Sequence, residues 1–552
     1  MIGALIVYFI GKYSIKLSGF STVILLALTT IAIFWLMDSL DIFSYSFAFL
    51  IAFMGVLNLL YSVGYMNHSH SQNRFYMFFL LMIGGLMGVA TSKDLFSFFL
   101  YWEIMSSWTL YFIIIHEQTQ TALKEGFKYF MFNYIGASIM FLGILVLSTN
   151  LESFAFSSLA QSFKTMPLFD ASLALICILI GFGMKAAMLP IRIDYQMHPA
   201  AAPTPVSGYI SAVLLKSAPF GIGKFIFALG GVTVVSKIAA SLDMASIMYI
   251  LAWISGITIF VAAALAIVQS GIKLMLIYST VSQIGYVMLG ISLGTSLGVA
   301  GGLLHLINHM IFKDLLFLVA GAIMYKTGID TLDKIGGLGK KMPITLITFV
   351  IGVFAVAGVP PFNGFTSKWL IYQAAMEQGY VFLALISLLT SVITLAYFMK
   401  FLHSAFFGQL PRNLENVKEV SWIMLAPMVI LAASCIIFGI FPGILLDVIS
   451  QIVLLFGLEG LEVSLFGLTT GIGAWNPGVI ALLLVIAMLV GGSVYFLGNK
   501  NVRYAKIYTC GVLNLEPEEL HVNSHNLYET PKKMIQGTTQ KLKNLITIGK
   551  GN

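Results

Sequence analysis

Long apolar segments follow one another along almost the whole chain, separated by short polar stretches. A run of about 18 or more apolar residues can cross the hydrocarbon core of a bilayer as a helix. The pattern therefore predicts an all-α integral membrane protein with about 14–16 transmembrane helices. We expect these helices at 1–17, 20–37, 42–66, 75–92, 94–115, 125–148, 171–197, 203–229, 246–268, 272–293, 297–325, 344–377, 380–407, 421–441 and 476–498.

Two regions lie outside this pattern. The segment 442–475 could hold an interfacial helix or one more span, and 499–552 is a polar tail. The first segment, 1–17, lacks the basic start and small-residue cleavage site of a signal peptide, so we expect a membrane helix there.

Composition supports a membrane environment. Hydrophobic residues make up 59% of the 552 positions and charged residues only 10%, whereas soluble domains have about 25% charged residues. We therefore expect the lipid bilayer to cover most of the surface. The formal charge of +7 does not indicate nucleic acid, because the lysines and arginines gather in loops on one face.

That charge asymmetry predicts an orientation. Cytoplasmic loops of membrane proteins carry an excess of lysine and arginine. We therefore place the C-terminus in the cytoplasm and the N-terminus outside. The basic residues expected on the cytoplasmic face are Lys326, Lys334, Lys340, Lys341, Arg412, Lys418, Lys500, Arg503 and Lys506.

Two of the expected helices contain prolines where a helix should continue: Pro190 in one, Pro360 and Pro361 in the other. Proline removes a backbone donor and clashes with the preceding turn, and broken helices in corresponding places point to a transport site. Pro190 and Pro360 are 170 residues apart, close to the offset between two five-helix blocks. We therefore predict N-terminal helices in 1–74, repeats in 75–229 and 246–408, C-terminal helices in 421–498 and a cytoplasmic tail in 499–552.

Ionisable residues deep in membrane helices are costly, so each is a candidate functional residue. His305, His309 and Lys313 are spaced i, i+4 and i+8 and should share one helix face. The candidates for ion translocation are Glu103, Lys185, Lys216, His305, His309, Lys313, Lys368 and Lys400.

A proton relay is the chemistry that these residue types favour. Burial lowers the proton affinity of a lysine and a nearby carboxylate restores it, so Glu103 beside Lys185 could switch that lysine between two charge states. Structural roles remain open: Glu103 as a fixed partner, Lys185 reaching for the interface, and Lys400 at a helix end. His305 and His309 also have the spacing of a metal pair, but a haem or copper site needs histidines from further helices.

These residues lie in motifs that resemble a known family, the antiporter-like membrane subunits shared by respiratory complex I, Mrp-type antiporters and energy-converting [NiFe]-hydrogenases. The run from Tyr278 to Tyr286 is the most specific. The other similar stretches are Tyr101–Glu103, Lys128–Phe130, Lys185–Pro190, Ala202–Ser207, His305–Lys313, Leu315–Phe317 and Gly358–Lys368.

The resemblance implies two inverted five-helix repeats, each with one broken helix. It implies proton or Na⁺ translocation across a cell's inner (cytoplasmic) membrane, driven by redox chemistry in other subunits. Glu103 and Lys185 would be the switch, Lys216 and the three residues from His305 to Lys313 the central relay, and Lys368 with Lys400 the far half-channel.

The hydrogenase-4 or formate-hydrogenlyase branch of the family is the most similar, through His198-Pro199, Leu214–Ser217 and the tail around Cys510. The partners would be other membrane subunits and peripheral redox subunits. Iron–sulfur clusters and a NiFe centre would lie only on those partners. This chain has three cysteines, fewer than the four ligands of a cysteine-bound cluster, so we expect no cofactor on it.

Three positions depart from the family pattern: Arg192, Asp194–Gln196 and Ser211. They affect the start of the first half-channel. Two alternatives stay open. One is a subunit of an Mrp-type Na⁺/H⁺ antiporter without a redox partner. The other is a membrane oxidoreductase with its own haem or quinone, which the shortage of histidine and cysteine ligands opposes.

Overall fold

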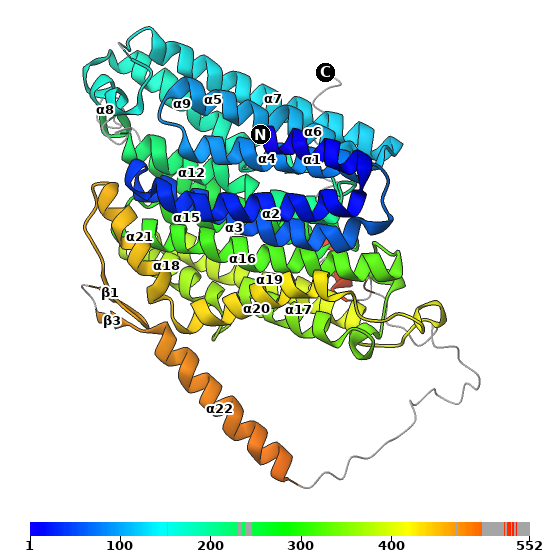
Figure 1. Cartoon of the computed structure of the whole chain (residues 1–552). Helices are drawn as coiled ribbons and strands as arrows, with labels where there is room; N and C mark the ends of the chain where they lie inside the picture. The colour runs from blue at the N-terminus through cyan, green and yellow to red at the C-terminus, as the bar shows by residue number, and fades with distance from the viewer. Residues whose placement is uncertain are drawn as a thin grey trace, which may run out of the picture.

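Helices joined by short loops make up nearly all of the computed structural model (Figure 1). The structure describes residues 1–151, 153–191, 193–229, 234–237, 246–470 and 473–498, and in the tail 524, 527–530, 533–534 and 537. Arg192, Cys510 and the tail lysines and arginine near 500–506 lie outside the described residues.

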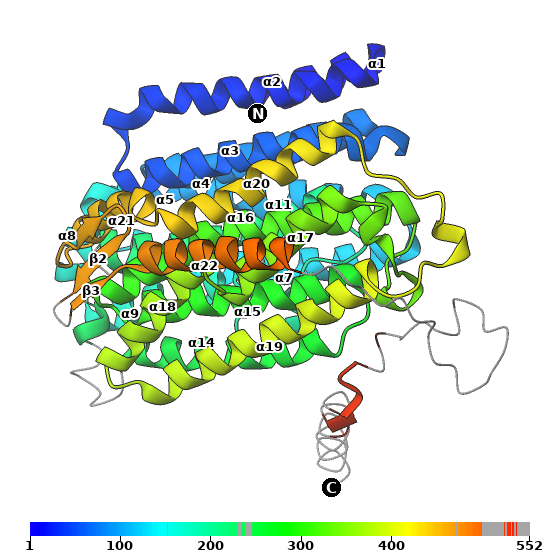
Figure 2. The ribbon, with the colours of Figure 1, turned by 90° about the horizontal axis from the view of Figure 1, so that it is seen from below.

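Three helices precede the first repeat and form one side of the bundle, with α1 and α2 outermost (Figure 2). They are α1 (Ile2–Tyr13), α2 (Ile15–Ile33, followed by a 3₁₀ turn at Phe34–Ser39) and α3 (Ile42–Tyr65). The predicted end of the first helix at residue 17 is wrong. Ser14 has extended backbone and its hydroxyl accepts from the Leu17 amide, which starts α2 as an N-cap.

The first repeat spans α4 to α12 and contains the first break. Its elements are α4 (Gln72–Thr91), α5 (Leu95–Glu103), a π turn (Ile104–Trp108), α6 (Thr109–Ile114), α7 (Gln120–Ser148), α8 (Phe156–Thr165), α9 (Leu168–Lys185), α10 (Ile193–Gln196), α11 (Thr204–Ala212), a 3₁₀ turn (Leu214–Lys216), α12 (Ser217–Gly223) and a second π turn (Lys224–Ala228). The short amphipathic α8 was not predicted, because its apolar run is too brief for a span.

The second repeat has the same order of long helices. They are α14 (Ile247–Ile267), α15 (Ile272–Ser292), α16 (Ser296–Thr327), α17 (Pro343–Ala357), α18 (Asn363–Glu377) and α19 (Val381–Phe406). The fourth helix of each unit is the broken one. Since each unit crosses the membrane an odd number of times, the second begins on the opposite face and runs inverted.

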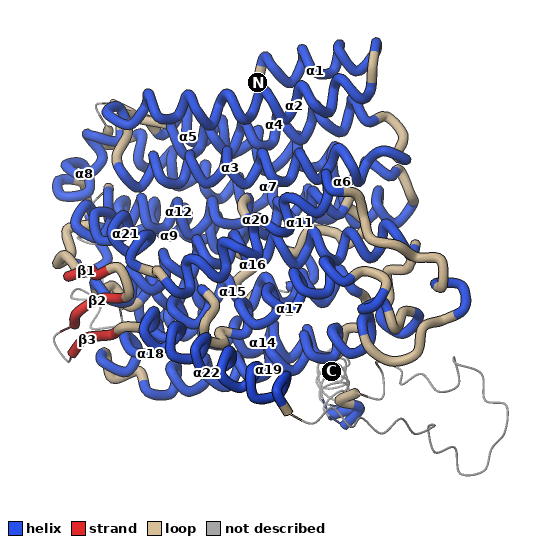
Figure 3. The backbone as a smooth tube through the Cα atoms, turned by 60° about the horizontal axis from the view of Figure 1, so that its bottom comes forward, coloured by secondary structure: helices blue, strands red, loops and turns tan. Residues whose placement is uncertain are grey.

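The C-terminal part resolves the ambiguous segment 442–475. After α20 (Trp422–Ile440) come α21 (Gly443–Leu455) and a small antiparallel sheet of β1 (Glu462–Ser464), β2 (Gly467–Thr470) and β3 (Gly473–Trp475). At 13 residues, α21 is about 20 Å long, shorter than the hydrocarbon core of about 30 Å. The strands, red in Figure 3, lie at one end of the helices and were not predicted.

The last helix, α22 (Pro477–Leu497), leaves the bundle after the sheet and points away from it (Figure 1). Only 6% of its most apolar window is buried within the chain. A helix that is hydrophobic on all sides requires lipid or protein around it.

The predicted fold is confirmed as an all-α, multi-pass membrane fold. Among the described residues, 13 helices are long and apolar enough to cross a membrane. The short α1 and the broken α17–α18 pair complete the predicted set. The 32-residue α16 runs through the centre and is buried from Leu297 to Ile323.

Helix α3 connects the two repeats through side chains. Asn58 donates to Asp314 of α16 at 2.6 Å, and the Tyr61 hydroxyl donates to the Leu318 carbonyl of the same helix at 2.8 Å. From the first repeat, the Tyr209 hydroxyl donates to the Ile51 carbonyl of α3 at 3.0 Å. All four of these side chains and backbone acceptors are buried.

Candidate functional site

The first helix break places Lys185 at the last residue of α9, with its side chain 4% exposed. Ala187 takes a positive φ of 56° and the chain turns before Pro190. Backbone groups freed by the break find side-chain partners. The Leu189 amide donates to Thr258 Oγ1 at 3.3 Å, and Gln196 Nε2 donates to the Met188 carbonyl at 3.1 Å. Irregular backbone at membrane depth is tolerated when it is buried in protein in this way.

The second break, at Gly358–Phe362 around Pro360 and Pro361, places Lys368 on the first turns of α18. Its Nζ donates to the Val356 carbonyl at 2.9 Å and to Ser391 Oγ at 3.0 Å, and lies 4.6 Å from the centre of the Tyr286 ring. The ammonium thus satisfies a carbonyl at the end of α17, where the negative end of the helix dipole favours a cation.

The predicted Glu103–Lys185 partners lie close enough to interact electrostatically. Glu103 is half-buried, one residue before the π turn at Ile104–Trp108. Both residues belong to the described chain, and no ion pair within 4.0 Å joins them there. Instead, Lys185 Nζ donates to Asn133 Oδ1 at 2.8 Å and lies 5.6 Å from the Tyr129 ring centre. A neutral amide on α7 is therefore the direct partner of Lys185.

Helix α16 places His305, His309 and Lys313 in the interior, all fully buried. His305 Nδ1 is 2.9 Å from Ser367 Oγ of α18, and its Nε2 is 3.2 Å from Gln283 Oε1 of α15. The rings of His305 and His309 are 6.3 Å apart between centres. His305 therefore connects α16 to the helix that carries Lys368.

Lys216 ends the 3₁₀ turn between α11 and α12 and is also fully buried. Its Nζ donates to the Ser211 carbonyl at 2.5 Å. It interacts electrostatically with Lys313 and Asp314. Lys313 Nζ lies between aromatic rings, 5.9 Å from the centre of Phe317 and 5.6 Å from that of Phe398. The two lysines belong to different repeats and interact electrostatically.

Sequence reasoning missed Asp314, a fully buried carboxyl group next to Lys313. Its Oδ2 accepts from Asn58 Nδ2 at 2.6 Å, while Oδ1 has no hydrogen-bond partner and lies 3.0 Å from the position a Cβ would take on Gly208. Ionisable residues deep in apolar helices are candidate functional residues, and Asp314 lies within a 32-residue apolar helix. The rule that identified the lysines therefore also applies to Asp314 and could have found it.

His198 is a second residue that the sequence did not place in the site. It lies after the first break, 3% exposed, with Nε2 lacking a hydrogen-bond partner. It interacts electrostatically with Lys185 and Lys313, and its ring centre is 6.2 Å from that of Phe317. His198 therefore lies between the first broken helix and the centre of the molecule.

The ionisable residues from Glu103 through Lys185, Lys216 and Lys313 to Lys368 form a series that we call the polar axis. Buried polar atoms without a protein hydrogen-bond partner gather along it. Such groups are rare in native proteins and are usually satisfied by water or an ion. Those on the polar axis are His198 Nε2, Ser211 Oγ, Ser217 Oγ, both ring nitrogens of His309, Lys313 Nζ, Asp314 Oδ1, Asn58 Oδ1, Gln283 Nε2 and Ser387 Oγ.

Lys400 has the contacts of a helix cap. Its Nζ donates to the carbonyls of Ile267 at 2.7 Å and Gln269 at 2.6 Å, at the end of α14. Helix C-termini leave carbonyl groups that a lysine can satisfy. The side chain is 4% exposed. These two contacts fit the structural role at a helix end that the sequence left open for Lys400.

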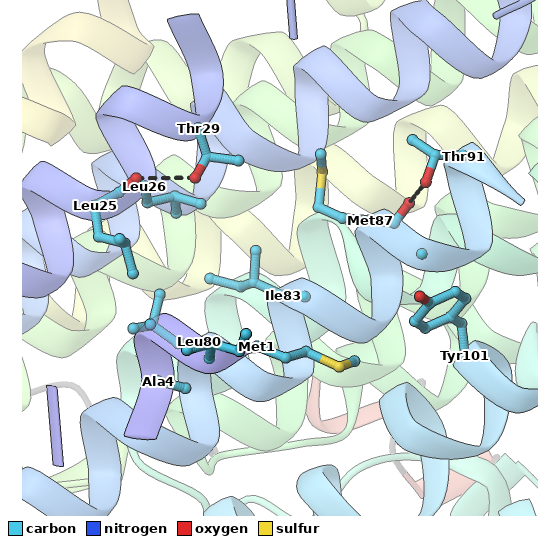
Figure 4. Close-up of a pocket in the computed structure, with 14 residues that line it drawn as sticks. Met1, Ala4, Leu25, Leu26, Thr29, Leu80, Ile83, Met87, Thr91 and Tyr101 are labelled. Carbon is cyan, nitrogen blue, oxygen red and sulfur yellow. Dashed lines mark hydrogen bonds between the residues drawn. The ribbon is translucent and has the colours of Figure 1, made fainter. Parts of the chain in front are cut away.

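A cavity of about 550 Å³ between α1, α2 and α4 lies off this axis (Figure 4). Leu25, Leu80 and Ile83 supply apolar lining, and Tyr101 closes one end. The hydroxyls of Thr29 and Thr91 donate to carbonyls of their own helices. The cavity therefore offers an ion little coordination.

Comparison with protein families gives two matches. Residues 92–394 match the model described as NADH:quinone oxidoreductase/Mrp antiporter, transmembrane, and residues 38–76 match the model described as the N-terminus of chain 5 of NADH-ubiquinone oxidoreductase (complex I). The first match covers more than half of the chain and includes the polar axis from Glu103 to Lys368.

Individual proteins similar to this chain come from a comparison of sequences and a comparison of solved structures. The chain is 32–33% identical to Na⁺/H⁺ antiporter subunit A1 of Staphylococcus aureus strains RF122 and Newman, over 73% of its own length, and it spans about half the length of those relatives, 52%. Among solved structures, a chain of the membrane-bound sulfane sulfur reductase, an archaeal respiratory membrane complex, matches with TM-score 0.84 and 26% identity over 100% of this chain and 95% of that one. A chain of the Mrp complex from Dietzia sp. DQ12-45-1b matches with TM-score 0.73 and 19% identity over 82% and 96%.

Proposed function

Because the chain belongs to the family of antiporter-like membrane subunits of NADH:quinone oxidoreductase and Mrp-type assemblies, we propose that it translocates protons along the polar axis as one subunit of a redox-driven membrane complex. Na⁺ is the alternative ion. The supporting observation is the series of fully buried lysines and histidines, several with no protein hydrogen-bond partner, between two broken helices.

In this proposal the proton passes from Glu103 and Lys185 through His198 to Lys313, which is coupled to Lys216, and then through His309 and His305 to Lys368. Each of these steps joins groups that interact electrostatically in the structure. Lysine suits this role because burial weakens its hold on a proton and brings the neutral form within reach. Lys400 would stand at the far end of the second half-channel.

Transport against a membrane potential needs an energy source, since each elementary charge costs about 2.3 kcal/mol per 100 mV. We propose that redox chemistry in peripheral partner subunits supplies it, with iron–sulfur clusters and a NiFe or related centre on those subunits. The likeness to the sulfane sulfur reductase chain over the whole length, at TM-score 0.84, supports this branch. Within the described residues, no group of three or more His, Cys, Asp or Glu side chains is arranged to hold a metal ion.

The second candidate is a subunit of an Mrp-type Na⁺/H⁺ antiporter without a redox partner. The 32–33% identity to the Staphylococcus aureus antiporter subunits favours it. The proteins that copurify with a tagged chain distinguish the two candidates. Redox subunits with metal centres support the first, and a set of membrane subunits alone supports the second.

We further propose that the basic loops face the cytoplasm of a cell with the chain in its inner membrane. The loop before α17 and the loop after α19 lie together, since the Gly337 amide donates to the Phe407 carbonyl at 3.0 Å and Lys341 Nζ donates to the Glu415 carbonyl at 2.6 Å. Lys334, Lys340 and Lys341 therefore share one face with the α19–α20 loop, as the positive-inside rule requires of a cytoplasmic face.

The complex purified through this chain and reconstituted in vesicles tests the function. We expect a reduced electron donor to drive proton uptake, followed with a pH-sensitive dye, and Glu103→Gln to slow it about tenfold, which corresponds to about 1.4 kcal/mol of barrier. Normal proton uptake with Glu103→Gln would contradict the role of Glu103. Ion exchange without any donor would favour the antiporter candidate.

Asp314→Asn should slow translocation about tenfold, or about 1.4 kcal/mol, while the chain still folds. The substituted amide can still accept the Asn58 hydrogen bond, but the ionisable carboxyl group beside Lys216 is lost. Asp447, which is exposed on α21, provides the matched control, and Asp447→Asn should leave the rate unchanged. Equal rates for the two variants, measured by dye uptake in vesicles, would remove Asp314 from the pathway.

A further inference from the structure

A partly buried ion pair lies away from the polar axis, where the π turn after α12 meets the start of α3. Lys224 Nζ donates to Ser44 Oγ at 2.8 Å, and that hydroxyl donates to Asp41 Oδ2 at 2.8 Å. Nζ is 3.7 Å from Asp41 Oδ2. The lysine side chain is 6% exposed and the aspartate side chain 35% exposed. The group therefore runs from the protein interior to the surface.

The pair lies at the membrane face opposite the basic loops. At the other end of α3, the Tyr65 ring packs 5.8 Å from the Tyr325 ring at the end of α16, where the basic loops begin. The start of α3 is therefore at the opposite end of the bundle. Phe156 of α8 covers Lys224 there, with its ring centre 5.0 Å from Nζ.

Lys224 lies at the opposite end of α12 from Lys216, the central lysine of the polar axis. Lys216 comes just before α12, Phe220 lies within it and Lys224 comes just after it. The Phe220 ring centre is 5.6 Å from Lys224 Nζ. It stacks on Phe47 at 4.4 Å and packs against Phe43 at 4.7 Å. Phe220 therefore lies between the two lysines along the chain, with two further buried rings packed on it.

The backbone at this place is also irregular. Lys216 ends a 3₁₀ turn and Lys224 begins a π turn. A π turn inside a helix frequently marks a functional site. A buried lysine is expensive to maintain, and here the carboxyl group of Asp41 and the hydroxyl group of Ser44 offset that cost.

We propose that Lys224, Ser44 and Asp41 form a surface station through which ions of the polar axis exchange with the membrane face opposite the basic loops, and that the rings of Phe220, Phe43 and Phe47 form the gate between this station and Lys216. This inference rests on the proposed function. The exchanged species is a proton, which Asp41 takes from or gives to water and passes through Ser44 to Lys224. Opening requires the Phe220 ring to move away from Phe47 and Phe43.

Accessibility of single cysteines tests the gate without relying on transport. In the whole complex, with Cys177, Cys435 and Cys510 replaced by alanine, we expect Lys224→Cys to react with a membrane-impermeant thiol reagent added to the face opposite the basic loops. Lys216→Cys should be protected there, and adding Phe220→Ala should speed its labelling by about tenfold or more. Labelling of Lys224→Cys only from the basic-loop face, or labelling of Lys216→Cys that is indifferent to Phe220, would overturn the inference.

A matched pair of aspartates tests the station in proton uptake. Asp41 and Asp94 cap α3 and α5 on the same face with the same hydrogen bonds, each accepting from the amide and hydroxyl of the serine three residues later. Asparagine caps a helix as well as aspartate does. We expect Asp41→Asn to slow uptake severalfold and Asp94→Asn to leave it unchanged.

Equal rates for the two variants would overturn the station. If no variant of the complex moved ions at all, the labelling pattern would still decide whether the gate exists, so failure of the proposed function and failure of this inference remain distinguishable.

Discussion

Lys313→Met should lower ion translocation by about 100-fold, equivalent to about 2.7 kcal/mol of added barrier, in a complex that still assembles. Methionine has a similar length and fills the space between Phe317 and Phe398. Replacing a buried charge with an apolar side chain is often neutral or stabilising, so loss of transport would not reflect unfolding. Proton uptake by reconstituted vesicles, with redox turnover measured in parallel, gives the rate.

The control is Lys326→Met at the end of the same helix. Lys326 is partly exposed, and its Nζ lies 5.9 Å from the Tyr325 ring centre near the basic loops. We expect this variant to transport normally. If Lys313→Met also transported normally, the polar axis would not carry the ion through the centre of the chain.

Gly364→Ala should destabilise the second break by about 3 kcal/mol or more, beyond ordinary overpacking. A Cβ on Gly364 would lie 1.8 Å from the Ala355 carbonyl oxygen and 2.9 Å from its carbon. Both atoms are backbone, so α17 and α18 must separate to admit it. Separation would move Lys368 from the Val356 carbonyl and from Ser391. We expect a lower thermal midpoint of the detergent-solubilised complex, together with lost proton uptake.

Gly183→Ala provides the comparison beside the first break. Gly183 lies inside α9, two residues before Lys185, and a Cβ there would have no neighbour within 4 Å. Alanine is favoured over glycine in a helix interior by about 1 kcal/mol. This variant should be as stable as the parent or more so. Similar losses in both variants would show that glycine at these breaks serves flexibility and not close packing.

Features that depend on local composition could be predicted from the sequence. Runs of apolar residues gave the helix positions to within a few residues, because crossing a bilayer needs a minimum length. Pro190 and Pro360 marked both breaks, because proline cannot continue the hydrogen-bond ladder. The candidate lysines and histidines were found for a similar reason, since ionisable groups stand out in an apolar run.

Features that depend on contacts between distant segments could not be predicted. Asn133 is the partner of Lys185, yet an asparagine 52 positions away carries no signal in one sequence. The alignment of Asn58 with Asp314 depends on how α3 packs on α16. The strands between 462 and 475 are short and mix apolar, polar and glycine residues. Their structure therefore depends on tertiary context.

Irregular helix turns also escaped prediction, and they coincide with the ionisable residues. A π turn follows Glu103, a 3₁₀ turn ends at Lys216, and breaks flank Lys185 and Lys368. Such turns leave backbone groups outside the regular ladder, where polar side chains can reach them. No residue type specifies a π turn as proline specifies a break, so the sequence alone does not reveal them.

Because Asn58, Tyr61 and Tyr209 tie α3 to both repeats, the two halves cannot rock past each other without losing these bonds and the packing around them. Many transporters with inverted repeats work by such rocking. This chain is built instead as a braced frame, so we expect the proposed transfer of charge to proceed by the swing of single side chains and the rearrangement of water.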